Sequence, residues 1–198
     1  MAYDIKIIKE KDFITSEWSG GKTTQMYIYP EESSYKELNF KWRISSATVD
    51  LKESDFTELA GVYRFITSLD NNLKLTHDYK KYIELKPFDI YEFCGDIRTH
   101  SFGQVKDFNL MLSNEAKGKL RNLNNKIEHI LEFANEGKTK KFEIFYSYYK
   151  PLVFLINDEE ILLNKNELLI IKLSSNTKIN VKILTQKTVN ILHASLME

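Results

Sequence analysis

The sequence predicts an all-β protein with little helix. Apolar and polar residues alternate with a period of two along most of the chain, which is typical of strands whose two faces differ. The alternating runs are short and rich in β-branched and aromatic residues. Turn-forming residues separate the runs, and many short strands with such spacing indicate a β-sandwich or a β-barrel.

In the N-terminal half, each alternating run ends at residues that favour turns. Pro30 closes the first run, the sequence Asp-Asn-Asn at 70–72 closes the third, and a loop is expected from Pro87 to Asp96. The strands predicted by this pattern are residues 23–29, 40–49, 62–69, 73–75, 82–85 and 104–112.

The C-terminal half contains a second series of short runs after the polar segment 113–119, where we place the seam between two parts of the chain. Residues 120–134 fit both a helical apolar stripe and a strand, and the all-β context favours strands there. The other predicted strands are residues 142–149, 152–156, 160–163, 168–173, 179–184 and 189–193.

The composition excludes several classes of protein. Lys plus Arg and Asp plus Glu both number 28, so the chain lacks the positive charge that nucleic acid or an anionic membrane would attract. The single cysteine, Cys94, excludes an internal disulfide. No apolar run approaches a membrane span, and the charged start lacks a signal-peptide pattern, so we expect a cytoplasmic protein.

The sequence Asp-Phe-Asn-Leu-Met at 107–111 places a carboxylate and an amide in a strand whose two faces are otherwise apolar. Asp107 and Asn109 share one face with Met111, and we expect this strand to be buried on both sides. Buried polar groups need partners. The pair therefore belongs either to a structural polar network or to a ligand site.

Arginine is rare in this chain, which uses lysine for most of its cations. Arg43 shares a strand face with the small residues Ser45 and Ala47, and Arg64 lies between apolar residues on its own face, so both are expected to point inward. One interpretation is a buried Arg–Asp pair that fixes strand register. The other is an anion clamp, in which Asp107 balances one arginine and the other binds a ligand carboxylate.

The sequence Trp-Ser-Gly-Gly-Lys-Thr at 18–23 is not a phosphate-binding loop, because Ser16 stands where that motif needs glycine and a strand pattern follows. It is either a tight turn entering a strand or a turn whose backbone approaches a ligand. The histidines lack metal-ligand spacing, so no metal site is expected. We expect Cys94 to be a small buried residue rather than a nucleophile.

These motifs, in this order, resemble those of the HutD/Ves family. The matching stretches lie between residues 10 and 112, while residues 113–198 match only as a β-rich half. Ala60 stands where the family usually has proline. The stretches are Trp-Ser-Gly-Gly-Lys-Thr-Thr-Gln at 18–25, Phe-Lys-Trp-Arg-Ile-Ser-Ser-Ala-Thr-Val at 40–49, Asp-Phe-Thr-Glu-Leu-Ala-Gly at 55–61 with Arg64, Phe-Cys-Gly-Asp at 93–96 and Gly-Gln-Val-Lys-Asp-Phe-Asn-Leu-Met at 103–111.

The resemblance implies a bicupin, which is two cupin-like β-barrels in one chain, often paired into a homodimer. The first barrel would comprise residues 1–112 and the second residues 113–198, with an exchange of strands between them left open. It also implies a bacterial protein, linked either to histidine utilisation or to stress-related expression, without the metal-binding histidines and cofactors of other cupins. No enzymatic activity is firmly assigned to such proteins.

The leading hypothesis is a non-catalytic protein that binds a small acidic metabolite and regulates histidine utilisation. One arginine would form the ion pair with the ligand, Trp18 would wall the pocket, and Asp107 with Asn109 would orient the arginines. The residues expected at the site are Trp18, Thr23, Gln25, Arg43, Ser45, Arg64, Asp107 and Asn109.

Two alternatives remain open. A metal-independent cupin-type enzyme could use Asp107 as a general base, which requires a raised pKa in a pocket that excludes water. A structural or interaction module would need no ligand, and its polar motifs would be only core. A cavity that joins Trp18, Arg43, Arg64 and Asp107 would distinguish a binding site from such a module.

Overall fold

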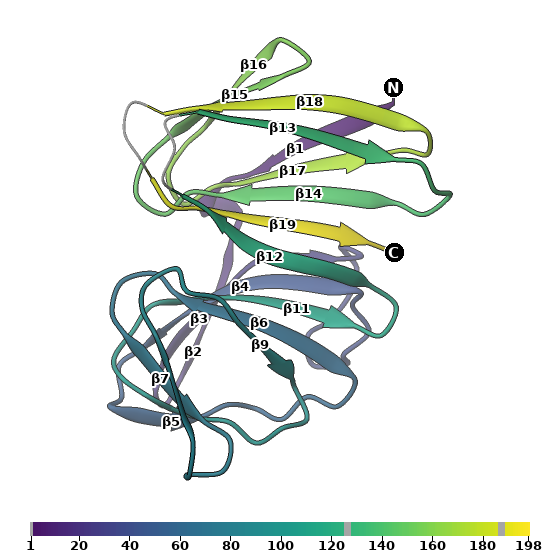
Figure 1. The fold of residues 1–198 in the computed structure, drawn as a ribbon. Helices are drawn as coiled ribbons and strands as arrows, with labels where there is room; N and C mark the ends of the chain where they lie inside the picture. The colour runs from purple at the N-terminus through teal and green to yellow at the C-terminus, as the bar shows by residue number, and fades with distance from the viewer. Residues whose placement is uncertain (1, 125–127, 186–188) are drawn as a thin grey trace. The chain divides into compact units, whose positions relative to one another are not determined.

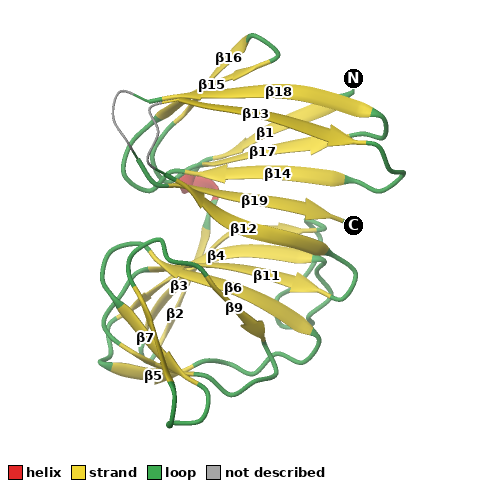
Figure 2. Cartoon of the chain, viewed as in Figure 1, coloured by secondary structure: helices red, strands yellow, loops and turns green. Residues whose placement is uncertain are grey.

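The regular structure of the protein is β-strand, apart from one short 3₁₀ turn, η1 (Glu10–Asp12), among the residues that the structure describes (Figure 2). The computed structural model describes residues 2–124, 128–185 and 189–198. The all-β prediction is thus confirmed. Within those ranges no helix is long and apolar enough to cross a membrane.

The chain forms two compact units. One comprises Phe13–Ala116, and the other combines Met1–Asp12 with Lys117–Glu198. The sequence-based division placed residues 1–12 with the first unit, whereas the structure places them with the second. The physical reason is that β1 (Tyr3–Ile8) pairs antiparallel with β17 (Leu168–Leu173) along its whole length.

The first unit contains two antiparallel sheets (Figure 1). The six-stranded sheet has the order β2-β3-β4-β11-β6-β9, and the four-stranded sheet has the order β5-β10-β7-β8. The strands are β2 (Ile14–Trp18), β3 (Gly21–Tyr29), β4 (Trp42–Val49), β5 (Glu53–Asp55), β6 (Val62–Ser68), β7 (Leu73–Thr76), β8 (Tyr82–Leu85), β9 (Tyr91–Cys94), β10 (His100–Phe102) and β11 (Asp107–Ser113).

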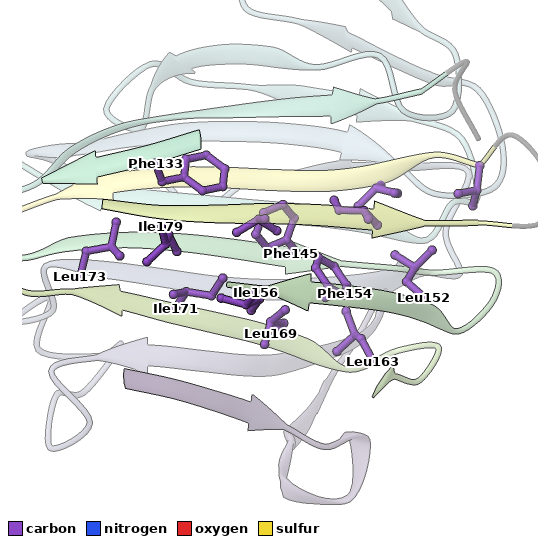
Figure 3. Close-up of a cluster of buried hydrophobic side chains, with 14 residues drawn as sticks. Phe133, Phe145, Leu152, Phe154, Ile156, Leu163, Leu169, Ile171, Leu173 and Ile179 are labelled. Carbon is purple, nitrogen blue, oxygen red and sulfur yellow. The ribbon is translucent and has the colours of Figure 1, made fainter. Parts of the chain in front are cut away.

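The second unit also contains two antiparallel sheets, with the orders β1-β17-β14-β19-β12 and β13-β18-β15-β16. Figure 3 shows a cluster of apolar side chains from these strands, including Phe133, Phe145 and Phe154, which fills the interior of this unit. The remaining strands are β12 (Lys117–Leu123), β13 (Glu128–Asn135), β14 (Lys141–Tyr146), β15 (Leu152–Ile156), β16 (Glu159–Leu163), β18 (Thr177–Leu184) and β19 (Ile191–Met197).

The ambiguous segment 120–134 contains strands on both sides of its middle, which confirms the choice of strands for β12 and β13. Ile127, which belonged to both candidate patterns, lies outside the described residues. The expected loop from Pro87 to Asp96 was wrong in part, because β9 lies within it and pairs with β6. Cys94, at the end of β9, is exposed and not buried as expected.

The register of β4, β11 and β6 places the polar motifs side by side on one face. Asn109 pairs with Ser45, and Met111 pairs with Arg43 on one side and with Arg64 on the other. Since side chains alternate across a strand, these residues and Asp107 share a face of the sheet. Every residue of β11 except the last is buried, which confirms the expectation for this strand.

A bulge in β3 changes which of its residues share that face. Gln25 pairs with Ser45, but the register shifts between Gln25 and Tyr27, so that Ile28 pairs with Arg43. The extra residue lets Gln25 and Ile28, three positions apart, point the same way. The inner face of β3 therefore changes from polar to apolar along its length.

Candidate functional site

A cavity of about 310 Å³ lies within the first unit. It is lined by every residue that the sequence analysis predicted at the site except Gln25. Gln25 does not line the cavity but accepts a hydrogen bond from Arg43, which does. The cavity is lined by Ser16, Trp18, Thr23, Tyr35, Arg43, Ser45, Ala47, Val49, Ser54, Asp55, Phe56, Thr57, Arg64, Asp107, Asn109 and Met111.

Arg43 is 4% exposed, and its guanidinium is held on three sides. Nε donates to Gln25 Oε1 at 2.8 Å, and Nη1 donates to Ser45 Oγ at 2.9 Å. The guanidinium carbon lies 4.3 Å from the centroid of the Tyr35 ring. Nη2 has no partner among the described residues and is not fully enclosed, so it remains as a donor toward the cavity.

Arg64 is 6% exposed, and its guanidinium contacts a different set of residues from those around Arg43. Nη2 donates to Asn109 Oδ1 at 3.1 Å, and Nη1 reaches the carbonyl oxygen of Thr57 at 3.4 Å. The guanidinium carbon lies 4.9 Å from the Phe56 ring centroid and 5.3 Å from that of Phe93. Nε is buried without a hydrogen-bond partner, which leaves this cation only partly satisfied.

Asp107 is 3% exposed, and its carboxylate accepts hydrogen bonds from the neighbouring strand β4 and from its own strand β11. Its Oδ1 accepts hydrogen bonds from the Ala47 amide at 2.8 Å and from Asn109 Nδ2 at 2.9 Å. Among the described residues Asp107 forms no ion pair with Arg43 or Arg64. Asn109 lies between carboxylate and guanidinium, so the direct Arg–Asp pair considered from the sequence is absent.

Burial changes the ionisation of all three charged groups. It lowers the pKa of Arg43 to about 10 and also lowers the pKa of Arg64, yet both cations stay protonated at neutral pH. Burial raises the pKa of Asp107 to about 6, against the opposing effect of the Ala47 amide. At neutral pH one buried carboxylate thus faces two buried guanidinium groups, and the excess positive charge favours an anion.

The turn before β3 follows from its glycines. Gly21 has a φ of +150°, and a Cβ there would lie 1.9 Å from the Thr48 carbonyl oxygen. Trp18, at the end of β2, is 40% exposed and contributes to the cavity wall. The segment is therefore the tight turn that the sequence indicated, and it also places Trp18 beside the cavity.

Several lining residues were not identified from the sequence. Tyr35 comes from the loop after β3, and Phe56 and Thr57 follow β5. The only signal for Phe56 and Thr57 was the family-like stretch at 55–61, which gave no role to either. Their contribution depends on contacts between segments distant in sequence, which periodicity does not reveal.

The second unit contains a separate buried polar network. His193 Nε2 lies 2.7 Å from Glu143 Oε2, and Arg121 Nε donates to His193 Nδ1 at 2.8 Å. Ser195 Oγ donates to Glu143 at 3.0 Å, and Lys141 Nζ lies 3.2 Å from the same carboxylate. These groups satisfy one another, so the network is a structural feature of the sheet. No cluster of three or more potential metal ligands occurs in the described parts of the chain.

The fold has well-matched relatives among solved structures. A conserved protein of unknown function from Pseudomonas aeruginosa PAO1 is 17% identical, with a TM-score of 0.84 and 98% of each chain covered. HutD from Pseudomonas fluorescens SBW25, in a formate condition, is 20% identical, with a TM-score of 0.76 and 98% of each chain covered. YhhW from Escherichia coli is 6% identical, with a TM-score of 0.66 and 97% of each chain covered.

These likenesses show the fold, which is that of cupin proteins, and confirm the predicted cupin-like architecture. No curated protein sequence matches the chain significantly. The model of the HutD family matches residues 10–190, which is most of the chain and covers the first unit with most of the second. The chain therefore belongs to the HutD family.

Proposed function

We propose that this protein binds a small carboxylate metabolite in the cavity of its first unit and does not convert it. The observation that carries the proposal is the pair of buried guanidinium groups that line the same cavity as the Asp107 carboxylate without an ion pair to it. Arg43 Nη2 supplies an unused donor at the cavity. A ligand carboxylate would balance the remaining charge and use the planar donors of an arginine.

Membership of the HutD family supports a place for this ligand in histidine utilisation, where binding would regulate the pathway. We extend the proposal to a homodimer, in which each copy carries its own complete site. All the lining residues come from one unit of one chain, so the site needs no residue from a partner.

The proposal is tested by replacing each arginine singly and titrating short carboxylates by calorimetry. We expect Arg43→Ala to weaken binding roughly tenfold or more, because a charged hydrogen-bond donor is lost in a buried site. Arg64→Ala should weaken binding less, since Asn109 and Thr57 already engage its donors. Lys22→Ala is the matched control, because that side chain is 58% exposed and pairs with Glu17.

Unchanged affinity in both arginine variants would contradict the carboxylate site. Equal losses in the Lys22 variant would show that general charge attraction, and not the cavity, carries the binding. Thermal unfolding of each variant separates lost binding from lost structure.

One observation favours a second candidate, an enzyme that uses Asp107 as a general base. Its carboxylate lies in a cavity and its pKa is raised to about 6, which suits proton transfer near neutral pH. Turnover of an imidazole-containing or formamido acid by the purified protein, abolished in Asp107→Asn, would support it. Binding without turnover supports the non-catalytic role.

A further inference from the structure

The Asp107 carboxylate uses only one of its oxygens inside the protein. Oδ1 accepts both hydrogen bonds, from the Ala47 amide and from Asn109 Nδ2. Oδ2 accepts none from the described residues, and it is not among the fully enclosed polar atoms that lack a partner. Since Asp107 lines the cavity, Oδ2 lies at the cavity wall as an unused acceptor.

The charged groups around Asp107 do not occupy this oxygen. Arg43 and Arg64 direct their bonded donors to other residues, and Asp70 acts on Asp107 only through its like charge. Asp55, which also lines the cavity, pairs with His100 at 3.0 Å. A carboxylate oxygen without a donor is costly in so enclosed a place, so the site is suited to a ligand that brings a donor.

The acceptor and the cation lie at different points along the same face. Arg43 pairs in register with Met111, and Asp107 lies four residues away on β11. That separation is roughly 13 Å between Cα atoms at about 3.3 Å per residue, and the long arginine side chain shortens the gap between the functional groups. Asn109 lies between them and donates its amide to Asp107. The polar row has a cationic end and an anionic end.

We propose that Asp107 contacts the ligand directly and selects carboxylates that carry a hydrogen-bond donor, a hydroxyl or an ammonium group, away from the carboxylate. This inference rests on the proposed carboxylate site and adds its specificity. Arg43 binds the carboxylate of such a ligand, and Asp107 Oδ2 accepts the hydrogen bond from the donor at its other end. The role differs from orienting the arginines, since Asp107 bonds to neither of them.

The pH dependence of ligand binding provides a second test of direct contact between Asp107 and the ligand, because Asp107 can change its protonation state. Burial raises its pKa to about 6. Above that pH the ionised Oδ2 can only accept, while below it the protonated carboxyl can donate. The preference for donor-bearing carboxylates should therefore weaken as pH falls through this value in the wild-type protein.

The test compares matched acids that differ only in a terminal ammonium group, which can donate a hydrogen bond but cannot accept one. Calorimetric titrations at about pH 7.5, where Asp107 is ionised, would use glycine, 3-aminopropionate and 4-aminobutyrate against acetate, propionate and butyrate. We expect the best amino acid of this series to bind roughly tenfold or more tightly than its unsubstituted partner. The chain length at which the preference is largest measures the reach from Arg43 to Asp107.

Asp107→Asn keeps the shape and the Oδ1 contacts but places an NH₂ donor where Oδ2 was. We expect this variant to lose the preference for the ammonium-bearing acid, which has no acceptor for the new NH₂, while still binding carboxylates through Arg43. The same pairs titrated with the wild type at about pH 5, where Asp107 is largely protonated, should also show a reduced preference. This arm requires no variant and stands even if Asp107→Asn fails to fold.

The outcomes separate the two proposals. Equal binding of both members of every pair by the wild type overturns the role of Asp107 and leaves the carboxylate site intact. A preference that persists in Asp107→Asn, or one that does not change between the two pH values, also overturns it. If no acid in either series binds, the carboxylate site itself fails and the specificity proposal falls with it.

Discussion

Two guanidinium groups stay buried in the first unit because aromatic rings cover them. Arg43 lies against Tyr35, and Arg64 lies against Phe56 and Phe93. Arginine is weakly hydrated and stacks on aromatic faces, so this burial costs less than it would for lysine. The use of arginine at these two positions, in a chain that otherwise prefers lysine, follows from that difference.

The raised pKa of Asp107 makes the free protein depend on pH in a defined direction. Its folded value of about 6 lies above the ordinary 3.8, so between these values the folded state holds a proton that the unfolded state has released. Stability therefore falls as pH rises through this window. Above about pH 6 the ionised carboxylate destabilises the fold by at most about 3 kcal/mol.

We therefore expect Asp107→Asn to be more stable than the wild type above about pH 6, with the difference shrinking toward pH 4. Urea unfolding of the ligand-free protein across this range measures it. Asp4→Asn is the control, because it also removes one carboxylate, but at an exposed position that does not line the cavity. A stability difference that is the same at every pH would contradict the shifted ionisation.

Sequence alone was sufficient for the inward positions of Arg43, Arg64, Asp107 and Asn109, because strand alternation decides which face a residue occupies. It did not reveal that Asn109 separates Arg64 from Asp107, since this depends on side-chain conformations across two strand pairs. Periodicity likewise could not show the bulge after Gln25.

At the level of strands, the entry to β3 depends on a glycine that no other residue can replace without rearrangement. Gly21 pairs with Trp18 of β2 on one side of β3 and with Val49 of β4 on the other. Its positive φ and its closeness to the Thr48 carbonyl both exclude a side chain. The backbone of β4 therefore approaches β3 closely where the cavity wall begins.

Gly21→Ala should destabilise the first unit by about 2 kcal/mol or more, through strain and a clash with backbone. Gly137→Ala is the matched control, since a Cβ there would meet its nearest atom at 3.5 Å. We expect that control to stay within about 0.5 kcal/mol of the wild type. Chemical unfolding checks both variants, and a tolerated Gly21→Ala would contradict the close approach of β3 and β4.

Across the whole molecule, each of the two units consists of two antiparallel sheets, but the units differ in what fills their interiors. The interior of the first unit combines an apolar cluster with the polar cavity. The second unit combines an apolar cluster, against which Ile5 and Ile7 of β1 also pack, with the satisfied network of Glu143 and His193. The proposed ligand site thus lies in the first unit, while β1 completes the core of the second.

Because β1 belongs to the second unit, a destabilising substitution in β1 should loosen that unit and not the first. Ile5→Asp places a charge against the apolar cluster, opposite Ile171, and should destabilise the second unit by roughly 1–3 kcal/mol. Hydrogen exchange should accelerate in β17 and leave β11 protected. Asp4→Ala, on the exposed face of the same strand, is the control. Equal acceleration in β11 would contradict the assignment of β1 to the second unit.

The pairing of β1 with β17 also determines how the chain can be made and divided. Translation releases β1 first, yet its partner strand emerges only after the whole first unit has been synthesised. The first unit can thus fold on the ribosome before β1 has a partner strand with which to pair. For the same reason, one cut near residue 116 does not yield two complete domains. The C-terminal fragment would contain β17 with an exposed edge, whereas β1, which covers that edge, would remain in the N-terminal fragment. The separated halves should therefore recombine.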